Sequence, residues 1–286
     1  MIRKSFSIPI LRMATPCHPG RGSGRLGESR VTIDFVFYGS LIVLGVAQAA
    51  FPLQRYGLLK PSWKQDLLWV VGGEQVIPRL VAWLQFYPAE WLAARTPALV
   101  HFGRLPPLAQ FGIALVLTDF TRYWLHRAFH VHPLLWDLHK AHHSSTELTA
   151  ISGARGGYLE SIVGECLTVA PLLLLGIRFD VYTGLMIFYG LQGMVLHSNL
   201  GIGSGLARIG LCTPAFHRWH HAKATLFRGG QNFGLVFRGW DVCFGTAHEP
   251  GTPPHALGFE GQEAFPSGYL GRLAYPLQKL WPGGSP

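Results

Sequence analysis

Long stretches without a charged side chain restrict the fold of this sequence more than any other feature. Phe35 to Gln54 has twenty residues without Asp, Glu, Lys or Arg, and Val181 to Ala207 has twenty-seven. At about 1.5 Å of rise per residue, twenty helical residues cross a hydrocarbon core of about 30 Å. Only 14% of the residues are charged, and the mean hydropathy is positive. These features predict an all-α integral membrane protein.

Three further apolar stretches raise the expected number of membrane helices to four to five. Tyr158 to Ile177 is interrupted by two glutamates, and we expect it to pair with the apolar stretch that follows a turn at 178–180. Leu105 to Thr118 leads towards His126, so this helix is expected to begin in lipid and end beyond it. Leu67 to Ala89 is interrupted by Glu74, Pro78 and Arg79, which leaves open a span or a helix lying in the membrane interface.

The ends of the chain differ from its middle in composition. Residues 1–30 contain six Arg or Lys against one Glu and lack the apolar core of a signal peptide. We predict a basic flexible tail over 1–33, a membrane-embedded domain over 34–250, and a Gly/Pro-rich C-terminal tail over 251–286.

The net charge of +9 does not lead us to predict nucleic-acid binding, because the basic residues are spread over connecting segments and both ends. Membrane proteins gather such residues on the cytoplasmic side. The four cysteines fit neither a CxxC metal motif nor a disulfide framework, which favours a reducing environment that faces the cytoplasm.

Nine of the fourteen histidines fall into four groups with the spacing of metal ligands. The groups are His126 with His130; His139 with His142 and His143; His197; and His217 with His220 and His221. Residues three or four apart share one face of a helix, so each group can point into one site. Adjacent histidines diverge by about 100°, and an HxxHH helix can therefore supply ligands to two ions.

Local signals place the two HxxHH groups on short helices. Pro133 is well suited to be the first residue of a helix that runs to about His143, with His132 as its cap. Thr213 and Pro214 form a good N-cap and first-turn pair for the helix that carries the last group.

His197 lies near the end of an apolar stretch, where an ionisable group is costly unless it faces a site lined by protein. If Val181 to Asn199 is a helix that returns to the side of the other groups, His197 arrives beside them. The remaining histidines His18, His101, His248 and His255 are expected to be ordinary loop residues.

Ligation by imidazole alone suits iron, zinc, copper or nickel, and nine ligands fit two ions at four or five each. Two other classes of protein compete with a dioxygen-activating enzyme. A membrane zinc-dependent hydrolase needs a carboxylate beside its ligands, as in HExxH, and no such spacing occurs. A non-catalytic metal transporter or sensor places polar ligands along its spans, whereas all the grouped histidines except His197 lie at or beyond the expected membrane boundary.

The order and spacing of the histidine groups resemble those of the sterol desaturase and fatty acid hydroxylase superfamily, which are membrane-bound di-iron oxygenases. The resemblance covers roughly residues 105–250, and the segments that carry it are 119–130, 135–144, 197–199, 214–221 and 232–246. There is one departure. Many members have Arg-x-His-Pro-x-Glu after the second group, whereas this chain has Arg155 to Glu160 with Gly157 at the histidine position.

The resemblance implies an oxidoreductase that uses two iron ions and dioxygen to hydroxylate or desaturate a C–H bond of a membrane lipid, such as a sterol or fatty acyl chain. It implies no catalytic residues beyond the nine metal ligands. The candidate hydrogen-bond partners for the outer ring nitrogens are Asp119, Asp137, Asn199, Asn232 and Asp241.

The chain contains no haem, flavin or iron–sulfur motif, so the resemblance implies an external electron donor: a ferredoxin, a cytochrome or a reductase. We expect it to dock on a basic face formed by Arg127, Lys140, Arg218 and Lys223. The expected location is the cell inner membrane in a bacterium or the endoplasmic reticulum in a eukaryote, with the active site facing the cytoplasm.

Overall fold

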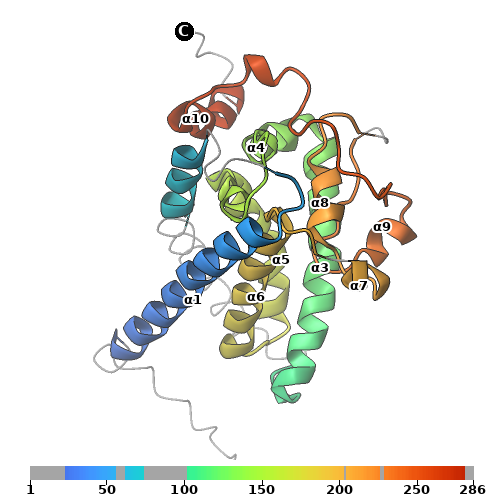
Figure 1. Cartoon of the computed structure of the whole chain (residues 1–286). Helices are drawn as coiled ribbons and strands as arrows, with labels where there is room; N and C mark the ends of the chain where they lie inside the picture. Colours follow the sequence, from blue (N-terminus) through green and yellow to red (C-terminus); the bar gives the residue numbers. More distant parts are fainter. Residues whose placement is uncertain (1–22, 56–61, 74–101, 203, 226–228, 281–286) are drawn as a thin grey trace, which may run out of the picture. The chain divides into compact units, whose positions relative to one another are not determined.

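The computed structural model describes residues 23–55, 62–73, 102–202, 204–225 and 229–280 (Figure 1). The chain divides into two compact units, Met1–Tyr38 and Gly39–Pro286. Helix α1 (Ser23–Ala50) runs from the first unit into the second, and every contact discussed below lies within the second unit. The regular elements of the described residues are helices, with a few isolated β-bridges, which confirms the all-α prediction.

The second unit is built from long and short helices that alternate with loops. A helical segment covers residues 63–73, ahead of the elements that surround the histidines. These elements are η1 (Phe102–Arg104), α3 (Pro107–Val131), α4 (Pro133–His143), η2 (Ala150–Ala154), α5 (Tyr158–Leu174), α6 (Phe179–His197), α7 (Ser204–Arg208), α8 (Pro214–His220), α9 (Gly239–Cys243), η3 (Gln262–Ala264) and α10 (Tyr269–Leu280).

Helix α3 is the element around which the others pack. It contacts α4, α5 and α6, and α6 in turn contacts α8 and η2 (Figure 1). An apolar core of Ala114, Leu172, Ile177, Tyr182, Leu185, Tyr189 and Val236 joins α3, α5 and α6 with the loop that precedes α9. This packing fixes the end of α3 that carries His126 and His130 next to α4.

The predicted starts of the two HxxHH helices are confirmed. Pro133 is the first residue of α4, which ends at His143, and His132 occupies the N-cap position without a side-chain hydrogen bond. Thr213 caps α8 because its side-chain oxygen accepts a hydrogen bond from the amide of Phe216 at 3.2 Å. The predicted turn at 178–180 lies a few residues earlier, because α5 ends at Leu174 and α6 already begins at Phe179.

Within the described ranges, we find no helix that combines the length and the apolar character needed to cross a membrane. The predicted four to five membrane spans are therefore not confirmed. The apolar stretch from Tyr158 forms a helix of 17 residues with Pro171 inside it. The stretch from Val181 is divided because α6 ends at His197. Residues 74–89 of the predicted Leu67 to Ala89 helix lie outside the described residues.

The two predicted tails contain regular structure where they are described. Residues 23–33 belong to α1, and residues 1–22 lie outside the described part of the chain. Residues 251–280 include α10, which packs against α4. That packing includes an apolar cluster of Trp69, Ala141, Phe259 and Phe265. The three domain boundaries remain predictions.

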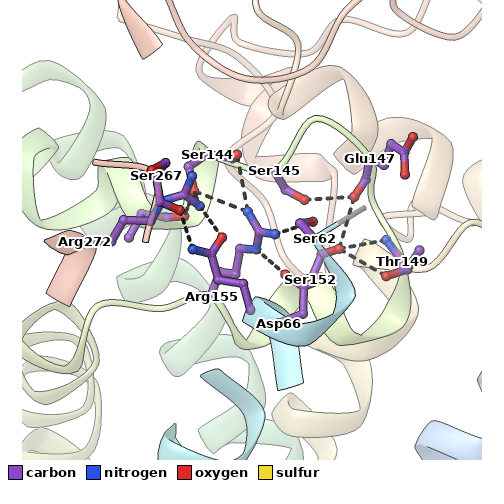
Figure 2. Close-up of polar contacts among 12 residues, drawn as sticks. Ser62, Asp66, Ser144, Ser145, Glu147, Thr149, Ser152, Arg155, Ser267 and Arg272 are labelled. Atoms are coloured by element: carbon purple, nitrogen blue, oxygen red, sulfur yellow. Dashed lines mark hydrogen bonds and ion pairs between the residues drawn. The ribbon is translucent and has the colours of Figure 1, made fainter. Parts of the chain in front are cut away.

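A buried ion pair joins the helical segment 63–73 to the loop that follows η2. The guanidinium of Arg155 contacts Asp66, and both side chains are almost completely buried (Figure 2). Arg155 also donates to the hydroxyl of Ser62 at 2.6 Å and to the carbonyl of Ser144 at 3.3 Å. The pair therefore ties Ser144, the residue that follows α4, to residues 62–66 and to the loop after η2.

Ser144 is held from a third direction by the C-terminal segment. Nη1 of Arg272 in α10 donates to the Ser144 hydroxyl and to Gln65 Oε1, both at 2.8 Å (Figure 2). The side-chain amide of Gln262 donates to the Ser144 carbonyl at 3.1 Å. Ser144 directly follows His143, so this network fixes the end of the second histidine helix.

We predict that Asp66→Asn destabilises the protein by about 3–5 kcal/mol, because it leaves the Arg155 guanidinium buried without its counter-charge. Chemical denaturation followed by circular dichroism measures the loss. Asp180→Asn is the control, since the Arg178–Asp180 pair is half exposed and such a pair contributes little to stability. Equal effects of the two changes would contradict a structural role for the buried pair.

Candidate metal centre

All nine predicted ligands come together, and they form two groups. The first group contains five histidines and the second contains four; within each group, the candidate ligand atoms lie within 4.8 Å of one another. The first group consists of His126, His130, His139, His143 and His220, and the second of His142, His197, His217 and His221.

Each HxxHH helix contributes to both groups, as the spacing predicts. Helix α4 supplies His139 and His143 to the five-histidine group and His142 to the four-histidine group. Helix α8 supplies His220 to the first group and His217 to the second, and His221 directly follows that helix. The divergence of neighbouring side chains around a helix explains this division.

The four-histidine group has the ring spacing of a metal site. The Nε2 atoms of His197, His217 and His221 lie 3.0–3.2 Å from one another, and that of His142 lies 3.1 Å from His197. Three mutually adjacent ring nitrogens cannot all be satisfied by hydrogen bonds among themselves, because each neutral ring carries one N–H. Nitrogens bound at about 2.0–2.1 Å to one ion lie about 2.9–3.4 Å apart. The residues therefore fit a shared metal ion.

The five-histidine group leaves buried ring nitrogens without partners. Within the described part of the chain, the Nε2 atoms of His130 and His220 are buried and make no hydrogen bond. His139 and His143 face each other with their Nε2 atoms 3.2 Å apart. An unsatisfied buried nitrogen costs free energy, and coordination of a metal ion removes that cost.

Burial keeps the rings in the form that binds metal. Removal from water and the nearby His139 together lower the pKa of His126 to about 3, and burial is the larger of the two causes. Burial is also the main cause that holds the pKa values of His142, His143 and His220 well below the usual value. Neutral imidazole is the ligand form, so the rings are ready to bind at neutral pH.

The outer nitrogens of four rings are held by acceptors that the sequence did not point to. His139 Nδ1 lies 2.7 Å from Oε1 of Glu160, which is in the first turn of α5. Backbone carbonyls hold the other three rings: that of Phe233 holds His126 at 2.9 Å, that of Gly193 holds His197 at 2.7 Å, and that of Gln231 holds His220 at 2.8 Å. These acceptors fix each ring so that its other nitrogen faces the site.

The prediction that Asp119 and Asp241 accept from the histidine rings is wrong. Asp241 accepts from the amides of Phe233 and Gly234, both at 2.8 Å. Asp119 accepts from the amides of Val236 and Phe237 and from the indole of Trp240, each at 3.0 Å. Both carboxylates thus hold the loop that carries the Phe233 carbonyl, and they act on the His126 ring through that loop.

The other three predicted ring partners also have different roles. Asp137 pairs with Lys140 at 2.5 Å on the outer side of α4. Asn199 accepts from Arg218 at 3.2 Å. Asn232 has a positive φ of 57° and donates to the carbonyls of Phe216 and His248, which sets the direction of the 231–233 backbone.

Gly157 stands where a side chain has no room. A Cβ atom at this position would lie 2.9 Å from the carbonyl oxygen of Leu138 in α4. The amide of Gly157 also lies 3.4 Å from Oε2 of Glu160. Glycine at this position, which departs from the superfamily pattern, therefore allows the chain to approach α4 closely. The approach is on the side where Glu160 contacts His139.

One residue of the predicted basic docking face, Arg218, does not lie at the surface. Arg218 is buried, and its guanidinium donates to Gln54 at 3.0 Å and to Asn199 at 3.2 Å. Its sequence position between two ligands gave no sign that it turns inward. Lys140 is paired with Asp137, while Lys223 is exposed.

A cavity of about 250 Å³ reaches both histidine groups. Its walls come from α3, α4, α5, α6 and α8, and they include His126 and His139 of the first group with His142, His197 and His217 of the second. Apolar side chains such as Phe129, Leu196 and Leu235 line it together with several polar ones. A small organic group can therefore lie against both candidate metal positions.

Comparison with known proteins agrees with this arrangement. Residues 111–246 match the family model described as fatty acid hydroxylase. Over these residues the chain is similar to fatty acid hydroxylases. The match includes all nine histidines and confirms the predicted resemblance.

The relatives of this chain are named for several different lipids. An ornithine lipid hydroxylase of Rhizobium tropici is 30% identical over 71% of this chain and 56% of its own length. An alkylglycerol monooxygenase of Homo sapiens is 31% identical over 46% of this chain and 29% of its own. A methylsterol monooxygenase of Aspergillus fumigatus is 30% identical over 50% of this chain and 48% of its own length. The matches thus span from under a third to just over half of these relatives, and no solved structure matches the chain.

We predict that Glu160→Gln weakens metal binding by the five-histidine group by about tenfold, because His139 loses a charged acceptor. Titration with a divalent metal in competition with a chelator measures both affinities, and the four-histidine group should change little. Asp137→Asn is the control, since that carboxylate contacts Lys140. A loss of affinity in the control, or none in Glu160→Gln, would show that the ring is held in another way.

Gly153→Ala should impair the four-histidine group selectively. The added methyl group would lie 2.8 Å from His197 Nδ1 and 3.3 Å from the Gly193 carbonyl that this nitrogen contacts. The His197 ring must then shift, and we expect about a tenfold or larger loss in the affinity of that group. Gly190→Ala in α6 is the matched control because nothing lies within 4 Å of its Cβ. The same titration decides between them, and unchanged binding in Gly153→Ala would contradict the assignment of His197.

Proposed function

We propose that this chain is an iron-dependent oxygenase that hydroxylates a C–H bond of a membrane lipid. The observation that carries the proposal is the division of nine histidines, seven of them buried, into groups of five and four at the wall of one cavity. The match to the fatty acid hydroxylase model and the hydroxylase and monooxygenase names of the relatives support it. One relative is named a sterol desaturase, so desaturation is the second outcome to be tested.

The two histidine groups would each hold one iron ion, at the positions described above. Imidazole is a suitable ligand for iron, and the unpartnered nitrogens of His130 and His220 are available to it. When bound, the iron pair supplies the activation of dioxygen and the oxidation of the C–H bond. The protein contributes the positions of the rings, through Glu160 and the carbonyls of Gly193, Gln231 and Phe233.

The surface of α3 supports contact with lipid. Ile113, Val116, Leu117, Phe120 and Trp124 are spaced three or four residues apart or adjacent, and each has 37–45% of its surface exposed. Val242 and Phe244 at α9 add exposed apolar area beside them, since Phe244 contacts Trp124 and Phe120. Large exposed apolar patches are typical of interaction sites and of membrane contact. We therefore propose that the chain acts at a membrane, with its active site on the cytoplasmic side.

An external electron donor is part of the proposal, because hydroxylation with dioxygen consumes two electrons that the lipid does not supply. A ferredoxin, a cytochrome or a reductase would serve. Arg127 and the exposed Lys223 remain candidate contacts for this donor, whereas the buried Arg218 does not.

The decisive test is the metal content and Mössbauer spectrum of protein purified without oxygen. We expect two coupled irons per chain, and we expect His142→Ala and His220→Ala each to lose iron and product formation, because they belong to different groups. His255→Ala is the control, since that side chain is exposed and far in sequence from the groups.

Several results would exclude the proposed oxygenase. One bound zinc would favour the zinc-dependent hydrolase, and metal that exchanges without any turnover would favour a transporter or sensor.

Lipid analysis of a deletion strain against its parent identifies the substrate through the oxygenated lipid that disappears. A lipid that loses a double bond would assign desaturation.

A further inference from the structure

Glycines form part of the wall of the cavity that reaches both histidine groups. Those that line it are Gly153, Gly156, Gly164 and Gly193. Gly164 lies in α5 and Gly193 in α6, and both helices pack against α3. A glycine in such a wall leaves space that the side chain of any other residue would occupy.

Gly153 and Gly156 have close neighbours that account for the missing side chain. A Cβ atom at Gly153 would lie 2.8 Å from Nδ1 of His197, and one at Gly156 would lie 3.1 Å from the hydroxyl oxygen of Ser161. Close packing of the protein against itself therefore explains glycine at these two positions.

Gly164 and Gly193 have no such neighbours. Among the described residues, nothing lies within 4 Å of a Cβ placed at Gly193, and a Cβ at Gly164 would meet only Cδ2 of Leu125, at an ordinary contact distance of 4.0 Å. Both glycines lie inside helices and neither has a positive φ. Alanine is more stable than glycine in a helix, so packing and backbone conformation both permit a larger residue here. The space at these two positions opens into the cavity.

Both positions lie one helical turn from the candidate metal centre. On α6, Gly193 precedes His197 by four residues. On α5, Gly164 follows Glu160 by four residues, and the carboxylate of Glu160 contacts His139. Residues four apart share one face of a helix and lie about 6 Å apart along its axis. The space at the two glycines therefore adjoins the part of a ligand that lies against the histidines.

We propose that Gly164 and Gly193 determine the width of the hydrocarbon that the cavity accepts beside the histidine groups. The proposal rests on the function proposed above and adds a class of lipid: one whose reacting carbon belongs to, or adjoins, a ring or a branched group. Leu125, Leu196 and Leu235 line the same cavity and favour hydrocarbon there. An unbranched chain would leave the space at the glycines empty, whereas a wider group fills it and gains van der Waals contacts.

The test compares two alcohols that differ in width. Dodecanol is an unbranched chain, whereas cyclohexylcyclohexanol has the same number of carbons in two rings. Isothermal titration calorimetry measures both dissociation constants with the full-length, iron-loaded protein in detergent micelles, kept without oxygen so that no turnover occurs. Titration into empty micelles corrects for partition of each alcohol. We expect the wild type to bind the ring compound at least as tightly as the chain.

Gly164→Ala and Gly193→Ala each place a methyl group in the open space. Each should weaken binding of cyclohexylcyclohexanol by about tenfold, the effect of overfilling a packed site, and binding of dodecanol by less than about threefold. Gly190→Ala is the matched control, because this glycine is also in α6 with nothing within 4 Å of its Cβ but does not line the cavity. All three variants should keep the wild-type metal affinity, and none should lower the unfolding temperature.

Five outcomes would overturn the proposal: tighter binding of the chain than of the ring compound by the wild type, unchanged binding of the ring compound in both variants, equal losses for the two alcohols, a similar loss in the control, and no binding of either alcohol. Loss of metal affinity in both variants would also contradict it.

The proposed function fails separately, because the alcohols are bound without turnover. A chain that selects by width but holds no iron would refute the oxygenase and leave the role of the two glycines. An active, iron-bound chain in which the alanine variants bind both alcohols as the wild type does would refute the role of the glycines alone.

Discussion

Nine imidazole rings share a buried space in which their inward nitrogens approach as closely as 3.0 Å, a separation that hydrogen bonding among neutral rings cannot satisfy for all of them. The rest of the second unit is arranged to keep the rings there. Helices α3, α4, α6 and α8 bring the rings together, and the apolar core under α3, α5 and α6 fixes the direction from which His126 and His197 arrive.

The rings are held in successive layers of contacts. Glu160 and three backbone carbonyls contact the outer nitrogens directly. Asp241 and Asp119 hold the loop of Phe233 through its amides, and Asn232 turns the backbone so that the carbonyls before and after it point to His220 and His126. This arrangement leaves the carboxylates away from the candidate metal ions, so the candidate ligands are all neutral imidazole rings.

The spacing of the histidines and the residues before each helix were enough to predict the site. Pro133 and Thr213 are local signals, and the four-residue intervals decide which rings of one helix belong to the same group. The ring partners could not be predicted in the same way. A backbone carbonyl has no residue type to mark it, and Glu160 reaches His139 only because α5 begins beside α4. Arg218 lies between ligands in a basic segment, and its burial depends on Gln54 and Asn199, which are distant in sequence. Apolar composition also did not reveal where each helix ends, as the break at His197 shows.

The contact between Arg272 and Ser144 has a consequence for the order of events during synthesis. All nine rings have been made once the ribosome passes residue 221, but the anchor at the end of α4 also needs a residue made about fifty positions later. Domains fold largely as their segments emerge, so an early intermediate would contain the complete set of rings with α4 still unanchored. Stable binding of a metal ion by these rings is therefore expected to follow the arrival of α10, and a nascent chain halted before residue 272 should exchange that ion faster than the finished protein.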